Sequence, residues 1–201
     1  TKRNQDVFNN IKSYYHIMME RIDYDLSHFL KTYNPLKLIN KGYILKWNIF
    51  LELLDQISSK LIVLQDKFKF MHNDLKCNNI LVKYQDSQKD FQDIQFILCD
   101  LGGASYEFEE KIYEGSVVGS DDKFNVCKDL FNFIHMLLSF SEHRIELIEF
   151  IEKNKLFELD KSLISLDKNV WIKIYQYGTT TNIINNCYDP RILQEKMRLF
   201  K

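Results

Sequence analysis

The sequence lacks the features that mark several large classes of protein. Its 27 basic residues nearly balance its 28 acidic ones, and the formal net charge of −1 gives no electrostatic reason to expect a nucleic acid or an anionic membrane as partner. The four cysteines are scattered, with no C-x-x-C pair and no histidines at zinc-ligand spacing. We therefore expect neither a disulfide framework nor a structural zinc site, and a reducing compartment is the default.

Long apolar runs and a signal peptide are missing as well. A typical apolar stretch, Phe133 to Phe140, is much shorter than the roughly 20 residues that span a bilayer, and it contains His135. We expect a cytoplasmic or otherwise intracellular protein with no membrane partner. The 201 residues, 45% of them hydrophobic and 27% charged, are enough for one ordinary globular unit with a buried core.

Apolar periodicity predicts a mainly helical α+β unit. Apolar residues recur at three- and four-residue steps over 43–65, which predicts a long amphipathic helix, and they cover nearly every side of 125–140, which predicts a central buried one. Shorter helices are expected over 25–30 and 145–156. Asp189-Pro190 predicts the start of the last helix, with the aspartate as N-cap and the proline in the first turn.

Short strands are expected between these helices. The apolar runs at 14–19, 70–71, 80–82 and 94–99 are bounded by polar or charged residues, as strands usually are. The glycines after residue 101 end the last strand, and we expect a loop from there to Asp122.

Two short motifs lie on this framework. Residues 71–82 read Met-His-Asn-Asp-Leu-Lys-Cys-Asn-Asn-Ile-Leu-Val, which resembles the catalytic loop H-x-D-L-K-x-x-N of eukaryotic-type protein kinases and the apolar strand that follows it. Further on, Asp100-Leu101-Gly102 ends a predicted strand and resembles the D-F-G motif of the same family. The order of the motifs and the hairpin expected between them also agree with the family.

The resemblance implies a role for each matched side chain. Asp74 would orient the substrate hydroxyl and accept its proton, and Lys76 would neutralise charge on the transferred phosphate of ATP. Asn79 and Asp100 would supply oxygen ligands to Mg²⁺. His72 and Asp129 would be structural. Asp129 is a charge inside a very apolar helix, and in the family an aspartate there accepts hydrogen bonds from the catalytic-loop backbone.

The N-terminal part resembles the last strand and hinge of the kinase N-lobe, over residues 1–24, with the C-lobe over 25–201. Met19 falls at the gatekeeper position, and the backbones of Glu20 and Ile22 would meet the adenine edge. Asp25 would reach the ribose hydroxyls, and Leu81 would form the apolar floor under the adenine ring. The resemblance thus implies the C-lobe of a protein kinase, a helical bundle with short hairpins that carry the catalytic and metal loops.

The sequence also departs from the family pattern. Lys76 resembles serine/threonine kinases, whereas Asn73 replaces the arginine that usually pairs with a phosphorylated activation loop. No A-P-E-like sequence lies between Asp100 and Asp129. There is no glycine-rich loop and no strand lysine, so we expect an N-lobe to be supplied upstream of Thr1 or in trans.

Three functions remain open on the sequence. The first is an ATP- and Mg²⁺-dependent serine/threonine kinase that phosphorylates a protein substrate. The second is a kinase-like scaffold or binding module that no longer transfers phosphate. The third is a small-molecule kinase of the choline or aminoglycoside type, whose loop often reads H-N-D or H-G-D. Lys76 and the glycine of the D-L-G motif favour the first.

Overall fold

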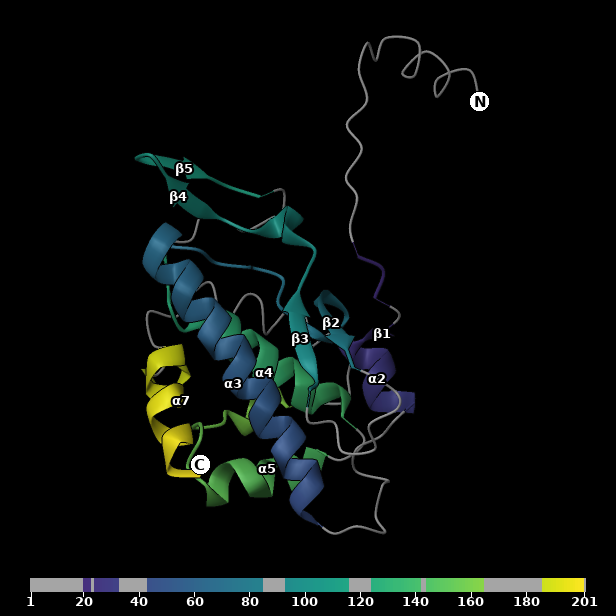
Figure 1. Cartoon of the computed structure of the whole chain (residues 1–201). Helices are drawn as coiled ribbons and strands as arrows, with labels where there is room; N and C mark the ends of the chain where they lie inside the picture. Colours follow the sequence, from purple (N-terminus) through teal and green to yellow (C-terminus); the bar gives the residue numbers. More distant parts are fainter. Residues whose placement is uncertain are drawn as a thin grey trace.

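The computed structural model describes residues 20–22, 24–32, 43–84, 93–115, 124–141, 144–164 and 186–200. In this part the chain is mixed α+β, with helices packed together and two small antiparallel sheets (Figure 1). The strand predicted over 14–19, and with it Met19, lies outside the described residues.

The longest helix among the described residues, α3 (Tyr43–Phe68), runs diagonally across the described part of the protein (Figure 1). It begins where the periodicity predicts and ends three residues later than expected, at Phe68 instead of Gln65. Leu54, Ile57 and Leu61 are fully buried at the helical spacing. One side of the helix therefore faces the core.

The second core element is α4 (Lys128–Phe140), which is buried on nearly every side, as predicted. It begins three residues later than the predicted Asn125, because Asn125 forms a turn in front of it: its side-chain oxygen accepts a hydrogen bond from Cys127 N (2.9 Å). No helix among the described residues has the length and apolarity needed to cross a membrane.

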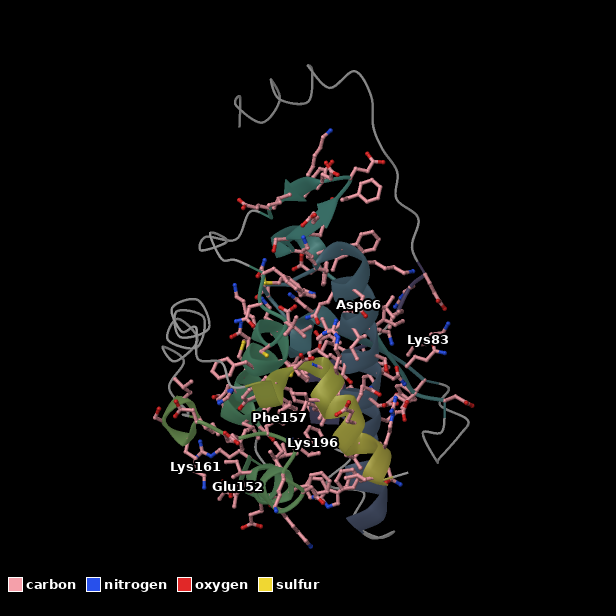
Figure 2. All side chains as sticks on the ribbon, turned by 90° about the vertical axis from the view of Figure 1, so that its left-hand side faces the viewer. Asp66, Lys83, Glu152, Phe157, Lys161 and Lys196 are labelled. Atoms are coloured by element: carbon pink, nitrogen blue, oxygen red, sulfur yellow. The ribbon has the colours of Figure 1, made fainter. Side chains whose placement is uncertain are left out.

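In the described part of the chain there are three shorter helices, α2 (Leu26–Thr32), α5 (Arg144–Lys153) and α7 (Pro190–Met197). Of these, α5 and α7 pack on this pair and α2 packs on a three-stranded sheet. The Asp189 side chain caps α7 by accepting a hydrogen bond from Arg191 N (2.8 Å), so the predicted start is confirmed. Arg191 also pairs with Asp66 of α3, which Figure 2 labels. The helix α5 stops before the predicted Leu156, because Lys155 adopts a left-handed conformation (φ 50°) that ends it.

A three-stranded antiparallel sheet has the order β1 (Tyr24–Asp25), β2 (Ile80–Lys83), β3 (Gln95–Leu98). Val82 pairs with Phe96, and both side chains are buried on the core face. The predicted hairpin between the two motifs is therefore confirmed. The predicted strand at 70–71 is reduced to a single bridge between Met71 and Ser105.

The interval after Gly103 is not the simple loop that we predicted. It contains a second hairpin, β4 (Tyr106–Phe108) and β5 (Lys111–Tyr113), which projects from the body of the protein (Figure 1). The connecting residues Glu109 and Glu110 both have positive φ (50° and 61°). Two-residue hairpin turns of this kind favour Asn-Gly, and the sequence carries no such turn signal, which is why the hairpin was missed.

Candidate functional site

The segment that follows α3 and the segment that follows β3 lie side by side. Met71 and Ser105 exchange two backbone hydrogen bonds, with N···O distances of 2.8 and 2.9 Å. Downstream, Cys99 N donates to Asn79 O (3.0 Å), which continues the β2–β3 ladder by one pair. The loop 72–79 and the loop 99–104 are thus fastened to each other at both ends.

His72 adds a third link between the two loops. Its Nε2 lies 2.9 Å from the carbonyl oxygen of Cys99, and its side chain is fully buried. Both the backbone N–H and the carbonyl of Cys99 are therefore hydrogen-bonded, and the next residue, Asp100, turns the chain with a left-handed conformation (φ 56°, ψ 64°). The side chain of Asp100 is exposed beside loop 72–79.

Asp129 anchors the first loop to the start of α4. Its Oδ2 accepts a hydrogen bond from His72 N (2.8 Å) and its Oδ1 accepts one from Asn73 N (3.0 Å), which are the bonds that the resemblance implies. Burial raises the pKa of Asp129, while these two donors and the nearby Lys128 ammonium lower it in part. The carboxylate has the buried partners that a charge in an apolar helix requires.

Asn73 connects more of the site than its place in the sequence indicates. Its Nδ2 donates to Gly103 O (3.1 Å) and to Ser105 Oγ (3.0 Å), and its Oδ1 accepts from Lys128 Nζ (3.1 Å). Its φ of 62° is left-handed, a region that asparagine tolerates better than most residues. Asn73 therefore joins both loops and α4 from the position where the family usually has arginine.

Asp74, Lys76 and Asn79 form a compact cluster on the first loop. Lys76 Nζ donates to Asp74 Oδ2 (2.6 Å), and Asn79 Nδ2 donates both to the same oxygen and to Asp74 O (2.9 Å each). Asp74 and Lys76 are about one-fifth to one-quarter exposed, with side-chain exposures of 22% and 24%. The carboxylate is thus oriented by two donors and remains accessible.

Asn79 and Asp100 are the two candidate metal ligands, and the structure brings them to the adjoining ends of β2 and β3. Because the Asn79 amide nitrogen is committed to Asp74, its Oδ1 faces away from that carboxylate. No group of three His, Cys, Asp or Glu side chains that could hold a metal occurs among the described residues. The pair fits Mg²⁺ only together with phosphate and water oxygens, which is how Mg²⁺ is commonly held beside a nucleotide.

The outer face of the β1–β2–β3 sheet leads towards these ligands. Asp25 pairs with Leu81, and Leu81 with Ile97, so the three side chains form a half-buried row on the face opposite the core. Directly beyond this row, Asn79 before β2 and Cys99 after β3 are joined by a backbone hydrogen bond. The apolar row on the sheet is thus followed along the chain by the candidate ligand Asn79.

The remaining predicted nucleotide contacts are only partly located by the structure. Asp25 caps α2, since its Oδ1 accepts from His28 N (2.6 Å), and its Oδ2 accepts from Asn78 Nδ2 (3.2 Å). Glu20 is exposed and pairs with Lys83 at the end of β2 (2.7 Å), and Ile22 is half-buried. The contacts predicted for Asp25, Glu20 and Ile22 with a nucleotide stay predictions.

Comparison with protein-family models, with curated proteins and with solved structures gives no significant match.

Proposed function

We propose that this chain carries the catalytic and magnesium loops of an ATP-dependent kinase that phosphorylates serine or threonine hydroxyls of a protein. The observation that carries the proposal is the fastening of loop 72–79 to loop 99–104. His72 and Asn79 both bond to Cys99, so the Asp74 cluster and the Asp100 carboxylate lie on two loops with a fixed relation. Alignment and charge neutralisation are what phosphoryl transfer needs from a protein.

In the proposed reaction, the substrate hydroxyl oxygen forms a bond to the γ-phosphorus of ATP while the bond from that phosphorus to the β,γ-bridging oxygen breaks, and ADP leaves. Asp74 accepts the hydroxyl proton, and Asn79 and Lys76 hold its carboxylate in position. Lys76 also offsets the negative charge of the γ-phosphate. Mg²⁺, when bound, neutralises phosphate charge, and Asn79 Oδ1 and the Asp100 carboxylate would hold it.

The sheet face gives the nucleotide an orientation. The adenine ring would lie on Leu81 and Ile97, and the phosphates would point along β2 towards Asn79 and Asp100. Asn79 directly precedes β2 and lies two residues before Leu81, which corresponds to about 7 Å along an extended chain. The apolar row on the sheet, with the candidate ligand directly beyond it, supports that direction.

The proposal includes an N-terminal lobe, encoded upstream of Thr1 or supplied in trans, that covers the nucleotide. Leu101, directly after Asp100, has a side chain that is 55% exposed. A large apolar side chain exposed next to a candidate metal ligand is what a covering lobe would bury.

The test is Mg²⁺-dependent transfer of labelled γ-phosphate from ATP to a mixture of protein substrates. The sample is the chain extended by the coding sequence that precedes Thr1. We expect Asp74→Asn to reduce transfer by at least about 100-fold, the contribution typical of a positioned base. Asp100→Asn should abolish transfer at every Mg²⁺ concentration. Asp93→Asn, at an exposed aspartate outside the cluster, should transfer phosphate at the unaltered rate.

The same assay separates the alternatives. Unchanged transfer by Asp74→Asn would show that this residue is not the proton acceptor. Binding of Mg²⁺-ATP without transfer by the unaltered protein would favour the scaffold. With choline and an aminoglycoside added to the mixture, labelling of either one in place of protein would favour the small-molecule kinase. Circular dichroism of each variant checks that the fold is retained.

A further inference from the structure

The β4–β5 hairpin exposes more large apolar side chains than any other element that the structure describes. Tyr106, Phe108, Ile112 and Tyr113 are 39%, 47%, 72% and 42% exposed. In both views the hairpin lies at the end of the molecule opposite α5, whose Glu152 is labelled (Figure 2). Exposed apolar side chains gathered on one small element commonly mark an interaction site.

The apolar side chains are surrounded by negative charge. Residues 106–114 contain four glutamates and one lysine, a net charge of −3, in a chain whose total is −1. Glu107 pairs with Lys69 (2.5 Å), whereas Glu109, Glu110 and Glu114 are exposed and form no ion pair with a described residue. A partner that covers this hairpin must therefore bring positive charge.

Two features of the hairpin suit a basic peptide in extended conformation. The rings of Tyr106 and Tyr113 stack at 5.0 Å with an angle of 11° between their planes, and aromatic faces of this kind attract guanidinium and ammonium groups. β5 pairs only with β4 among the described strands, which leaves its outer edge able to pair with an added strand.

The two ends of the hairpin are fastened to the two loops of the candidate site. At its start, Ser105 bridges to Met71 and its Oγ accepts a hydrogen bond from Asn73 Nδ2. At its end, the backbone of Gly115 packs so closely on the loop that a Cβ there would lie 2.4 Å from the carbonyl carbon of Gly103. The hairpin surface is thus held in a fixed place relative to Asp100, the proposed metal ligand.

From this geometry we propose that the β4–β5 hairpin is a docking surface for a basic, lysine- or arginine-containing segment of the protein substrate. That the docked segment belongs to a substrate rests on the proposed kinase function, whereas docking of a basic segment does not. The glutamates supply the charge complementarity, the tyrosine pair supplies the aromatic contact, and the attachment to loop 99–104 brings the docked chain close to the reacting groups.

The test measures binding of fluorescent peptides to the 201-residue chain, without ATP or Mg²⁺, by fluorescence anisotropy. The probe is a peptide of about 12 residues in which arginines flank one serine, and its controls carry glutamine or glutamate in place of every arginine. We expect only the arginine peptide to bind, and its binding should weaken as salt rises. Glu109→Lys/Glu110→Lys should raise its dissociation constant by at least about 10-fold.

A matched control reverses the same amount of charge elsewhere. Glu149→Lys/Glu195→Lys alters two exposed glutamates on α5 and α7 and should leave the dissociation constant within about twofold of the unaltered chain. Ile112→Ser, at the most exposed apolar residue of the hairpin, should weaken binding without changing net charge.

Equal binding of the arginine and glutamine peptides, or equal effects of the two charge-reversal variants, would overturn the proposal. Sedimentation velocity tests whether a second copy of the chain occupies this surface. A dimer of the unaltered chain that Ile112→Ser dissociates, with no peptide bound, would assign the surface to a second copy instead. If the peptide binds but the extended protein transfers no phosphate, the docking surface is supported and only the proposed kinase function is contradicted.

Discussion

Asp129 is the residue on which the geometry of the first loop depends most. It receives backbone hydrogen bonds from His72 and Asn73 at full burial, with the ammonium of Lys128 beside it. Removing one member of such a group leaves the others buried without a partner, which costs more than the bond itself contributes.

We therefore predict that Asp129→Asn lowers the free energy of unfolding by about 3 kcal/mol, since the amide can accept only one of the two N–H groups and the buried Lys128 loses the carboxylate beside it. Adding Lys128→Met should recover part of that loss by removing the buried ammonium charge. Urea denaturation followed by circular dichroism measures both. A single variant within about 0.5 kcal/mol of the unaltered protein would show that Asp129 does not anchor the loop.

Part of this site could be predicted from the sequence. Asp129 stood out because a charge in an apolar helix needs partners, and the resemblance of the two motifs to a known family placed Asp74, Asn79 and Asp100 on adjoining loops. The role of Asn73 could not be predicted in the same way. Its bonds to Gly103, Ser105 and Lys128 depend on how three separate segments pack, and the only local signal is that asparagine accepts a left-handed backbone.

At the scale of elements, periodicity predicted α2, α3, α4 and α5, the Asp189-Pro190 pair predicted α7, and local geometry decided where the helices end. Long apolar repeats fix a helix because they bury one face, whereas ends depend on single turns such as the one that Asn125 forms before α4. The β4–β5 hairpin was missed because both of its strands are short and mostly exposed, so it has no buried alternation to detect.

The turn of that hairpin gives an element-scale prediction. Glu109 and Glu110 occupy two left-handed positions, which cost roughly 1 kcal/mol each in residues other than glycine and asparagine. We expect Glu109→Asn/Glu110→Gly to slow amide hydrogen exchange in 106–113, since Asn-Gly suits this turn. Glu109→Gln/Glu110→Gln removes the same charge without relieving the backbone and should leave exchange unaltered. Faster exchange in the Asn-Gly variant would contradict the assigned turn geometry.

This pair of variants also bears on the docking surface. Both remove two carboxylates, so both should weaken binding of the arginine peptide, whereas only one should make the hairpin more rigid. A more stable hairpin that binds less well would mean that the two glutamates serve recognition at the expense of local stability.

At the scale of the whole molecule, α4 connects the candidate site to the C-terminal part of the chain. Its first turn holds loop 72–79 through Asp129, and its middle holds the segment 156–160 and the turn at Tyr188 through His135. His135 Nδ1 lies 3.0 Å from Phe131 O, and its Nε2 accepts a hydrogen bond from Asp160 N (3.3 Å). Only the neutral ring with its proton on Nδ1 satisfies both contacts.

This arrangement makes stability depend on pH in a defined direction. Burial lowers the pKa of His135 below 6.5, although the Phe131 carbonyl and Asp160 oppose that shift. Because the folded pKa lies below the unfolded one, the stabilisation is complete above pH 6.5. It decreases as the pH falls towards the folded pKa, since the unfolded chain takes up the proton first.

We predict that the unaltered protein loses stability between about pH 7 and pH 5 more steeply than His135→Gln, by up to about 1.4 kcal/mol per pH unit from this group. His28→Gln, at an exposed histidine of α2, should keep the steep dependence. Chemical denaturation at a series of pH values gives the slope of the unfolding free energy against pH for each variant. Subtracting one variant's slope from another's removes the contribution of carboxylates that titrate in both. Equal slopes for the unaltered protein and His135→Gln would mean that the ring is protonated without penalty, so that α4 and the segment around Asp160 are not joined through Nε2.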